Sequence, residues 1–218
     1  MDIEPIRAQL AKFKAERKKV FATSSIQTQS VALLHIISRI DKSIPIFFIN
    51  TGYLFPETID YKDQIVAEFG LNIIDVKSFV PKNIQKDSMG NLLFTSDPDY
   101  CCYLNKIQPL DNILIENDVW INGIRADQSA NRKEMNEIEK APHNVLRYHP
   151  ILNWTKQELY KYIKEHKLPR HPLDDKGYIS IGCEPCTRKI QIGDSEREGR
   201  WFGMKKTECG LHTNLVIK

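Results

Sequence analysis

The sequence lacks the features that mark several large classes of protein. It has no apolar run approaching the roughly 20 residues of a membrane-spanning helix, and its first residues lack the charged-then-apolar pattern of a secretory signal. Neither sign of charge dominates, because 31 Lys and Arg against 28 Asp and Glu leave a net charge of +3. We therefore expect a cytoplasmic protein that binds neither membranes nor nucleic acid, and whose mild positive charge suits at most an anionic substrate.

Two common nucleotide-binding motifs are also absent. The sequence contains neither the Gly-Lys-Ser/Thr ending of a Walker A loop nor the glycine-spaced fingerprint of dinucleotide-binding folds. Any nucleotide would have to be bound by loops of another kind.

What the sequence does contain is an alternation of short β-branched and aromatic runs with amphipathic stretches. This alternation predicts a doubly wound α/β fold around a mainly parallel sheet. We expect strands at 19–23, 45–49, 72–76, 119–122 and 145–148, and helices at 31–40, 57–69, 98–106, 111–117 and 155–166. Regular periodicity fades after about residue 173. One domain, 1–218, with an irregular C-terminal extension is therefore predicted.

Polar loops follow three of the predicted strands, at the edge where open α/β sheets bind ligands. The Ser- and Gln-rich loop 24–30 enters a helix, so its hydroxyls, backbone amides and positive helix end suit an anion. In the next loop, Gly52 would let a ligand approach the backbone closely. The stretch 120–132 adds glycine, polar and basic groups. Taken singly, the first two loops fit ordinary polar turns as well.

The five cysteines divide into four and one. Cys101 and Cys102 are adjacent, Cys183 and Cys186 form a Cys-x-x-Cys pair, and Cys209 stands alone near the end. In a reducing compartment, metal ligation or catalysis is favoured over disulfides. Adjacent cysteines on a helix diverge by about 100 degrees, which separate irons of one cluster accommodate. The first four predict a zinc site or an iron–sulfur cluster, with small buried hydrophobes as the alternative for the adjacent pair.

The remaining thiol, Cys209, is a candidate nucleophile. Lys106 follows the adjacent cysteines, and Arg188, Arg197 and Arg200 follow the Cys-x-x-Cys pair. Guanidinium groups hold phosphate and sulfate oxygens bidentately, and nearby cations lower the pKa of a thiol. Each of these cations alone is more often a solvated surface charge.

Together these segments resemble the assimilatory sulfonucleotide reductases, specifically the iron–sulfur type that uses adenosine 5′-phosphosulfate. The matching segments are 101–102 with 106–110, 123–129, 183–188, 196–201 and the ending Glu208-Cys209-Gly210-Leu211-His212. The likeness runs over about 24–212. It implies an adenine-nucleotide hydrolase-like fold and cytosolic sulfate assimilation.

The resemblance also implies roles for particular residues. The catalytic cysteine is Cys209. The ligands of a [4Fe–4S] cluster are Cys101, Cys102, Cys183 and Cys186. The residues implied to bind the substrate are Ser24, Ser25, Thr51, Gly52, Lys106, Gly123, Arg132, Arg197, Arg200 and His212.

The implied reaction proceeds through an S-sulfocysteine. The Cys209 thiolate attacks the sulfate sulfur, AMP leaves, and a dithiol protein (thioredoxin or glutaredoxin) then releases sulfite. Because the sequence has no second Cys-x-x-Cys, we expect this reductant to act in trans. A homo-oligomer is compatible with the sequence.

Some residues depart from the family pattern. Asn50 stands where Asp is usual, Asn122 and Ala126 replace the commoner Thr and Arg, and Gln29 replaces an acidic residue of some members. A reductase that also accepts the 3′-phosphorylated nucleotide is therefore an alternative. The less favoured alternatives are a thiolation-type ATP-pyrophosphatase, which expects a Ser-Gly-Gly-x-Asp-Ser loop, and a zinc-stapled binding module.

Overall fold

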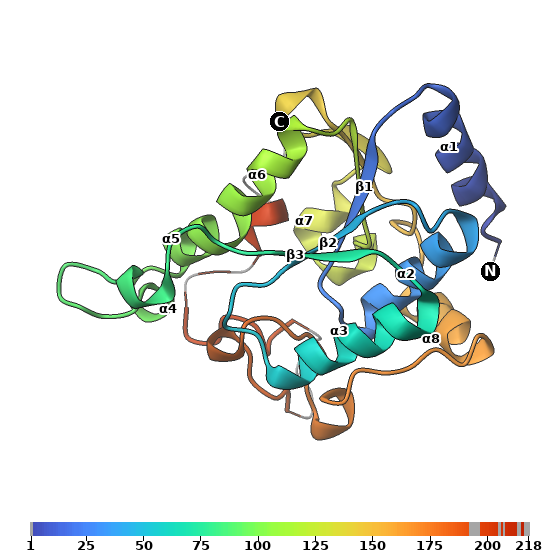
Figure 1. Cartoon of the computed structure of the whole chain (residues 1–218). Coiled ribbons are helices and arrows are strands. Elements are labelled where there is room, and N and C mark those ends of the chain that lie inside the picture. Colours follow the sequence, from blue (N-terminus) through green and yellow to red (C-terminus); the bar gives the residue numbers. More distant parts are fainter. Residues whose placement is uncertain (1, 192–196, 205, 207, 213–214, 216–218) are drawn as a thin grey trace.

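A six-stranded sheet with strand order β3-β2-β1-β4-β6-β5 forms the centre of the protein (Figure 1). The computed structural model describes residues 2–191, 197–204, 206, 208–212 and 215. Neighbouring strands are parallel, except that β5 runs antiparallel to β6 at the edge. The strands are β1 (Val20–Ser24), β2 (Ile46–Ile49), β3 (Ile73–Val76), β4 (Val119–Asn122), β5 (Ile138–Lys140) and β6 (Leu146–Tyr148). The predicted mainly parallel sheet is confirmed.

Helices cover both faces of the sheet, as a doubly wound fold requires. One face packs against α1 (Glu4–Ala15), α2 (Thr28–Ile40), α3 (Pro56–Phe69) and α8 (Lys156–Glu165). The other face packs against α6 (Gln108–Ile115). The short helices α4 (Leu93–Ser96), α5 (Pro98–Cys102) and α7 (Ala130–Lys133) complete the set of α-helices. No described helix has the length and apolar character needed to cross a membrane.

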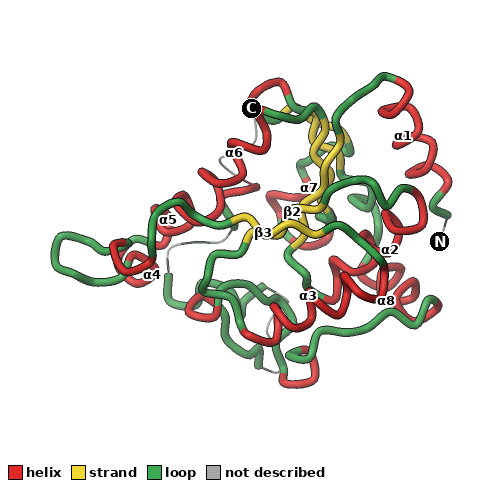
Figure 2. The backbone as a smooth tube through the Cα atoms, viewed as in Figure 1, coloured by secondary structure: helices red, strands yellow, loops and turns green. Residues whose placement is uncertain are grey.

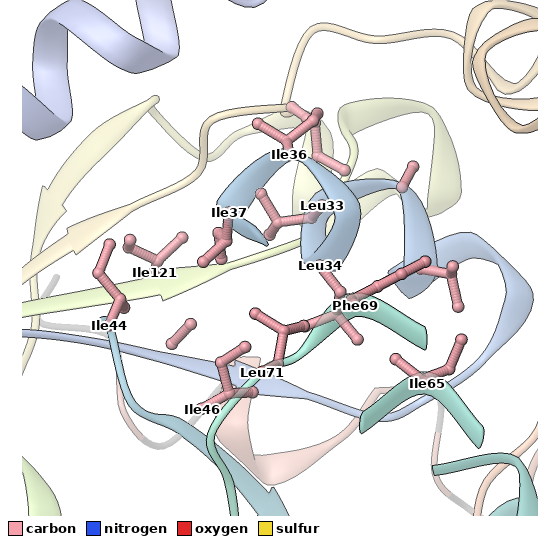
Figure 3. Close-up of a cluster of buried hydrophobic side chains, with 14 of the residues drawn as sticks. Leu33, Leu34, Ile36, Ile37, Ile44, Ile46, Ile65, Phe69, Leu71 and Ile121 are labelled. Atoms are coloured by element: carbon pink, nitrogen blue, oxygen red, sulfur yellow. The ribbon is translucent and has the colours of Figure 1, made fainter. Parts of the chain in front are cut away.

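The two-residue period of the strands divides the core in two. Along β4, Val119 and Ile121 face the α2 side, whereas Trp120 faces the α6 side. Figure 3 shows the larger cluster, in which Leu34 and Ile37 of α2 lie over the sheet near Ile46 and Ile121. Because each face of the sheet is buried under its own helices, the direction of every strand side chain is fixed. This includes the last side chain of each strand, at the carboxyl edge of the sheet.

Local signals explain where several helices begin and end. Pro56 begins α3, one residue before the predicted start, and Gly70 ends it with a left-handed φ of 63°. Thr155 and Glu158 form a capping box at the start of α8. The structure differs at α2, which begins at Thr28, three residues before the predicted start.

Four of the described α-helices and strands were not predicted from the sequence: the short helices α4 and α7, the N-terminal helix α1 and the edge strand β5. The N-terminal helix α1 buries only a narrow stripe made of Ile6, Leu10 and Phe13, whose spacing is helical. The edge strand β5 has just three residues, two of them charged, so it carries little alternation. The predicted helices 98–106 and 111–117 are also corrected, because a π-helix at Tyr103–Ile107 joins α5 directly to α6.

The chain after α8 is mostly loop (Figure 2). Its beginning is fastened to the helices by His171, which is 1% exposed. The backbone N–H of His171 donates to Thr28 Oγ1, its Nδ1 accepts from the Leu173 N–H, and its Nε2 lies 3.0 Å from Thr58 Oγ1. This buried imidazole therefore has a structural role.

The buried His171 predicts a loss of stability in acid. Burial lowers its pKa from 6.5 to about 4, with Glu57 opposing the shift. As the pH falls from 6.5 towards 4, the unfolded chain therefore takes up a proton that the folded chain refuses, and the free energy of unfolding falls by about 2–3 kcal/mol. Chemical denaturation of His171→Gln should show a smaller decline over this range. The control His143→Gln, at a partly exposed imidazole, should decline like the wild type, and equal slopes in all three proteins would contradict the assignment.

Candidate active site

The residues predicted to bind the substrate converge on one cavity at the carboxyl edge of the sheet. Its volume is about 190 Å³. It lies where β1 has β2 on one side and β4 on the other, which is where the order of the strands reverses. The predicted residues that line it are Ser24, Ser25, Thr51, Lys106, Gly123, Arg132, Arg197, Arg200 and Cys209.

The loop after β1 forms one wall through hydrogen bonds among its own side chains. Ser25 Oγ lies 3.0 Å from Ser30 Oγ and accepts from Gln27 Nε2 at 3.0 Å. Ser24 Oγ accepts from the Ile26 N–H at 3.1 Å. Ile26 is buried and has φ of 52°, a left-handed conformation that β-branched residues rarely adopt. The strained turn directs two serine hydroxyls and the first turn of α2 towards the cavity.

Two residues predicted to bind the substrate are not found in the lining of the cavity. Gly52 does not line the cavity, and its φ of 68° serves a turn in which a side chain would collide with Lys82. The side chain of His212 lies outside the described part of the protein. The neighbouring Thr51 does line the cavity, and its hydroxyl lies 3.2 Å from Cys183 Sγ.

The four cysteines predicted to hold a metal line a second, smaller cavity beside the first. Cys101 and Cys102 end α5, and Cys183 and Cys186 bracket a tight turn that pairs with the loop after β2. Asn105, which is buried, donates its amide towards Cys101 Sγ at 3.6 Å. Within the described ranges, no three His, Cys, Asp or Glu side chains are grouped closely enough to hold one metal ion.

The π-helix explains how the adjacent cysteines reach this cavity. Pro109 has no N–H to bond the carbonyl of Asn105 and would clash with it in a regular α-helix. The wider π turn at Tyr103–Ile107 lies immediately before it and carries Lys106, which lines both cavities. One local irregularity thus positions the adjacent cysteines and the lysine together.

The four thiols form an electrostatically coupled set. Burial, together with the charges of Cys102, Cys183 and Cys186, raises the pKa of Cys101 to about 12 against the opposing effect of Lys106. Four thiolates without a cation would repel one another in such a desolvated site. A metal centre supplies the positive charge that makes four such thiolates compatible, so the donor set fits an iron–sulfur group.

The environment of Cys209 favours its thiolate. Burial raises its pKa, but Lys106, the Leu211 N–H and Arg200 outweigh this, so that the pKa lies below the ordinary value for cysteine. The pKa of Lys106 itself is lowered by burial and raised more strongly by Cys183, Cys209 and Cys102, so the lysine stays protonated. Cys209 is therefore the sulfur suited to nucleophilic attack.

The arginines of the cavity are held in different ways. Arg200 packs its guanidinium against Gly182, where any side chain would collide with it, and lies 4.5 Å from the ring centroid of Trp201. Arg132 and Arg197 both donate to the carboxylate of Glu208, the residue before the nucleophile.

Two residues of the site were not assigned a role from the sequence. Glu208 appeared only as part of the C-terminal motif, and Asn122 only as a departure from the family pattern. Asn122 ends β4, is 4% exposed and lines the cavity, yet neither its side-chain oxygen nor its nitrogen has a hydrogen-bond partner among the described residues. A buried amide in this state provides one donor side and one acceptor to a ligand.

Comparison with known proteins identifies the family. Residues 19–189 match the model of the phosphoadenosine phosphosulfate reductase domain, which is most of the chain. The chain belongs to this family. The match contains both cysteine pairs and the loops after β1, β2 and β4, and it ends before Cys209.

Curated relatives within this family extend the match towards the C-terminus. The adenosine 5′-phosphosulfate reductase of Bacillus cereus (strain Q1) is 36% identical over 202 residues, covering 92% of this chain and 86% of the relative. The enzyme of the same name from Salinibacter ruber is 36% identical over 186 residues, covering 84% and 74%. The structure of a phosphoadenylyl-sulfate reductase from Candida auris is similar with a TM-score of 0.67 at 23% identity, covering 82% of this chain and 87% of that one. This last likeness confirms the fold.

The position of Lys106 predicts the acidity of Cys209. Lys106→Gln removes a positive charge that stabilises the thiolate, so the pKa of Cys209 should rise. The measurement is the rate of iodoacetamide alkylation at Cys209 against pH, followed by mass spectrometry of the C-terminal peptide. The half-maximal rate should move to higher pH in Lys106→Gln and stay near the wild-type position in Lys106→Arg. An unchanged profile in Lys106→Gln would show that the lysine does not tune this thiol.

Proposed function

We propose that this protein is a cytoplasmic enzyme that reduces adenosine 5′-phosphosulfate to sulfite and AMP in assimilatory sulfate reduction. The observation that carries the proposal is the position of Cys209, a thiol of lowered pKa in the same cavity as Lys106, Arg197 and Arg200. The family and the names of the curated relatives support the same activity.

The first step is transfer of the sulfo group to the enzyme. The Cys209 thiolate attacks the sulfate sulfur, an S–S bond forms, and the S–O bond to the nucleotide breaks with its electron pair going to the AMP phosphate. The substrate anion repels an incoming thiolate, so this step depends on cations that offset both charges. Lys106 is placed to do this for the nucleophile, and Arg197 and Arg200 for the phosphosulfate.

The second step regenerates the cysteine. A thiolate of an external dithiol protein, thioredoxin or glutaredoxin, attacks Cys209 Sγ, and sulfite leaves with the electron pair of the S–S bond. The second thiol of the dithiol protein then resolves the mixed disulfide and frees Cys209. For this step Cys209 must be reachable from solution, so the segment that carries it has to leave the cavity.

The proposed cofactor is a [4Fe–4S] cluster held by Cys101, Cys102, Cys183 and Cys186. When bound it supplies positive charge and cross-links two distant segments of the chain, and neither step above passes electrons through it. The residues of this chain that link the cysteines to the substrate cavity are Thr51, which contacts Cys183, and Lys106, which lines both cavities. The contact from Asn105 towards Cys101 would orient that sulfur.

The direct test is sulfite release by anaerobically purified protein with thioredoxin, on adenosine 5′-phosphosulfate and separately on its 3′-phosphorylated analogue. Turnover of the first nucleotide alone or predominantly supports the proposal. Comparable turnover of both would make the enzyme a dual-specificity reductase. Failure with both, on iron-loaded protein, would overturn the proposal.

Replacement of the nucleophile separates chemistry from folding. Cys209→Ser should abolish sulfite release, because a serine hydroxyl neither ionises near neutral pH nor forms the S–S bond. It should keep the iron content and melting temperature of the wild type. Residual turnover near the wild-type rate would refute the role of Cys209.

Replacement of a predicted ligand should act on the cofactor instead. Cys183→Ser removes one of four thiolates, so the purified protein should lose most of its iron and its brown absorbance together with activity. The matched control is Cys209→Ser, the same chemical change at a thiol outside the set, which should stay brown. A colourless Cys183→Ser protein with full activity would remove the cluster from the proposal.

A further inference from the structure

The buried carboxylate of Glu208, the residue before the nucleophile, accepts five hydrogen bonds from described residues. It is 7% exposed. Its Oε2 accepts from Arg132 Nε at 3.1 Å and from Ser129 Oγ at 3.2 Å. Its Oε1 accepts from Arg132 Nη2 at 3.2 Å, Arg197 Nη2 at 2.6 Å and the backbone N–H of Cys209 at 2.9 Å.

These donors come from separate segments of the chain. Ser129 and Arg132 lie at the start of α7, after β4, whereas Arg197 belongs to the segment after the Cys-x-x-Cys turn. Glu208 therefore joins three segments through one buried group. We call Arg132, Glu208 and Arg197 the carboxylate bridge.

The bridge is needed because the two arginines repel each other. Burial and the charge of Arg132 lower the pKa of Arg197 to about 10, while Glu208 opposes both effects. Without a carboxylate between them, two partly desolvated guanidinium groups would face each other with nothing to offset their charge. Loss of Glu208 is therefore expected to separate the arginines and release the segment that carries the nucleophile.

The bridge also leaves one donor unused. Arg197 Nε is buried and has no hydrogen-bond partner in the described part of the structure, although Arg197 lines the cavity. Glu208 engages only the Nη2 corner of Arg197. Arg197 is thus anchored to Glu208 through Nη2, while its Nε is available among the described contacts to donate to an anion in the cavity.

We propose that Glu208 is a positioning residue for the reaction, which holds Cys209 over the cavity and orients Arg197 through the carboxylate bridge. Its carboxylate accepts from the backbone of the nucleophile and from the arginine that faces the anion, so one group sets the position of both. Releasing the bridge lets Cys209 leave the cavity for the external dithiol. This inference rests on the proposed function for its kinetic part, whereas the position of Cys209 can be measured without turnover.

The first test measures access to Cys209 with iodoacetamide on iron-loaded protein without nucleotide. At high pH the thiol is fully ionised, so the plateau rate of alkylation reports exposure and not acidity. Glu208→Gln should raise this plateau at least tenfold, because an amide cannot neutralise two guanidiniums. The plateau of Glu208→Asp, which keeps the charge, should lie between those of the wild type and Glu208→Gln. The matched control is Glu134→Gln, an exposed carboxylate two residues from Arg132, and its plateau should equal that of the wild type.

The second test separates positioning from binding. In Glu208→Gln, kcat for sulfite release should fall at least tenfold because the nucleophile is misplaced, whereas KM for the nucleotide should rise by a smaller factor because Arg197 is less well oriented. Melting temperature and iron content should stay near those of the wild type. A general structural defect would instead lower both of these and raise KM.

The outcomes distinguish the two proposals. An unchanged alkylation plateau in Glu208→Gln overturns the positioning role, whatever the enzyme turns over. An equal fall in kcat and rise in KM, with a lowered melting temperature, overturns it as well. If the wild type releases no sulfite but the alkylation plateau is higher in Glu208→Gln than in the wild type, the proposed function is wrong and the positioning role of Glu208 is supported.

Discussion

Positive charge at one edge of the sheet is the constraint on which the site depends. Four cations line the same cavity, where desolvation makes unbalanced positive charge costly. Lys106 is balanced by sulfur atoms, and Arg132 and Arg197 share the carboxylate of Glu208. The C-terminal segment is thus held over the sheet by charge pairing more than by regular structure.

The same constraint connects the two cavities. Lys106 lies between the four-cysteine set and Cys209, so its charge acts on both. The protein places this lysine with a π-helix, an irregularity that shifts the side chains between α5 and α6. A regular helix through this stretch would have to accommodate Pro109 and would turn the lysine and the cysteines to different angles.

The sequence predicted most of the fold because its signals are local. The run Ile46–Ile49 and the stretch Val119–Asn122 are apolar enough to be strands in any context, and Pro56 and Gly70 mark both ends of α3. The π-helix was not predicted, since it leaves no mark in the apolar periodicity of the sequence. The edge strand β5 forms only because β6 offers it a partner.

The candidate site was predicted in part for the same reason. Cys209 and the cysteine pairs stand out by type and spacing, and the loops by their place after strands. Glu208 and Asn122 have no local signal, because what distinguishes them is a relation to residues far away in the chain. The bridge joins Glu208 to Arg132, 76 positions earlier, and the orphaned amide of Asn122 is recognised only once its surroundings are known.

The hydrogen bond that fixes Trp201 to the Cys186 carbonyl sets the length of a tether. Only eight positions separate Trp201 from Cys209, so a nucleophile released from the cavity can travel at most about 25–30 Å. Its return is an intramolecular event at an effective concentration on the order of millimolar. The short tether therefore keeps the nucleophile close to its own cavity whenever it leaves.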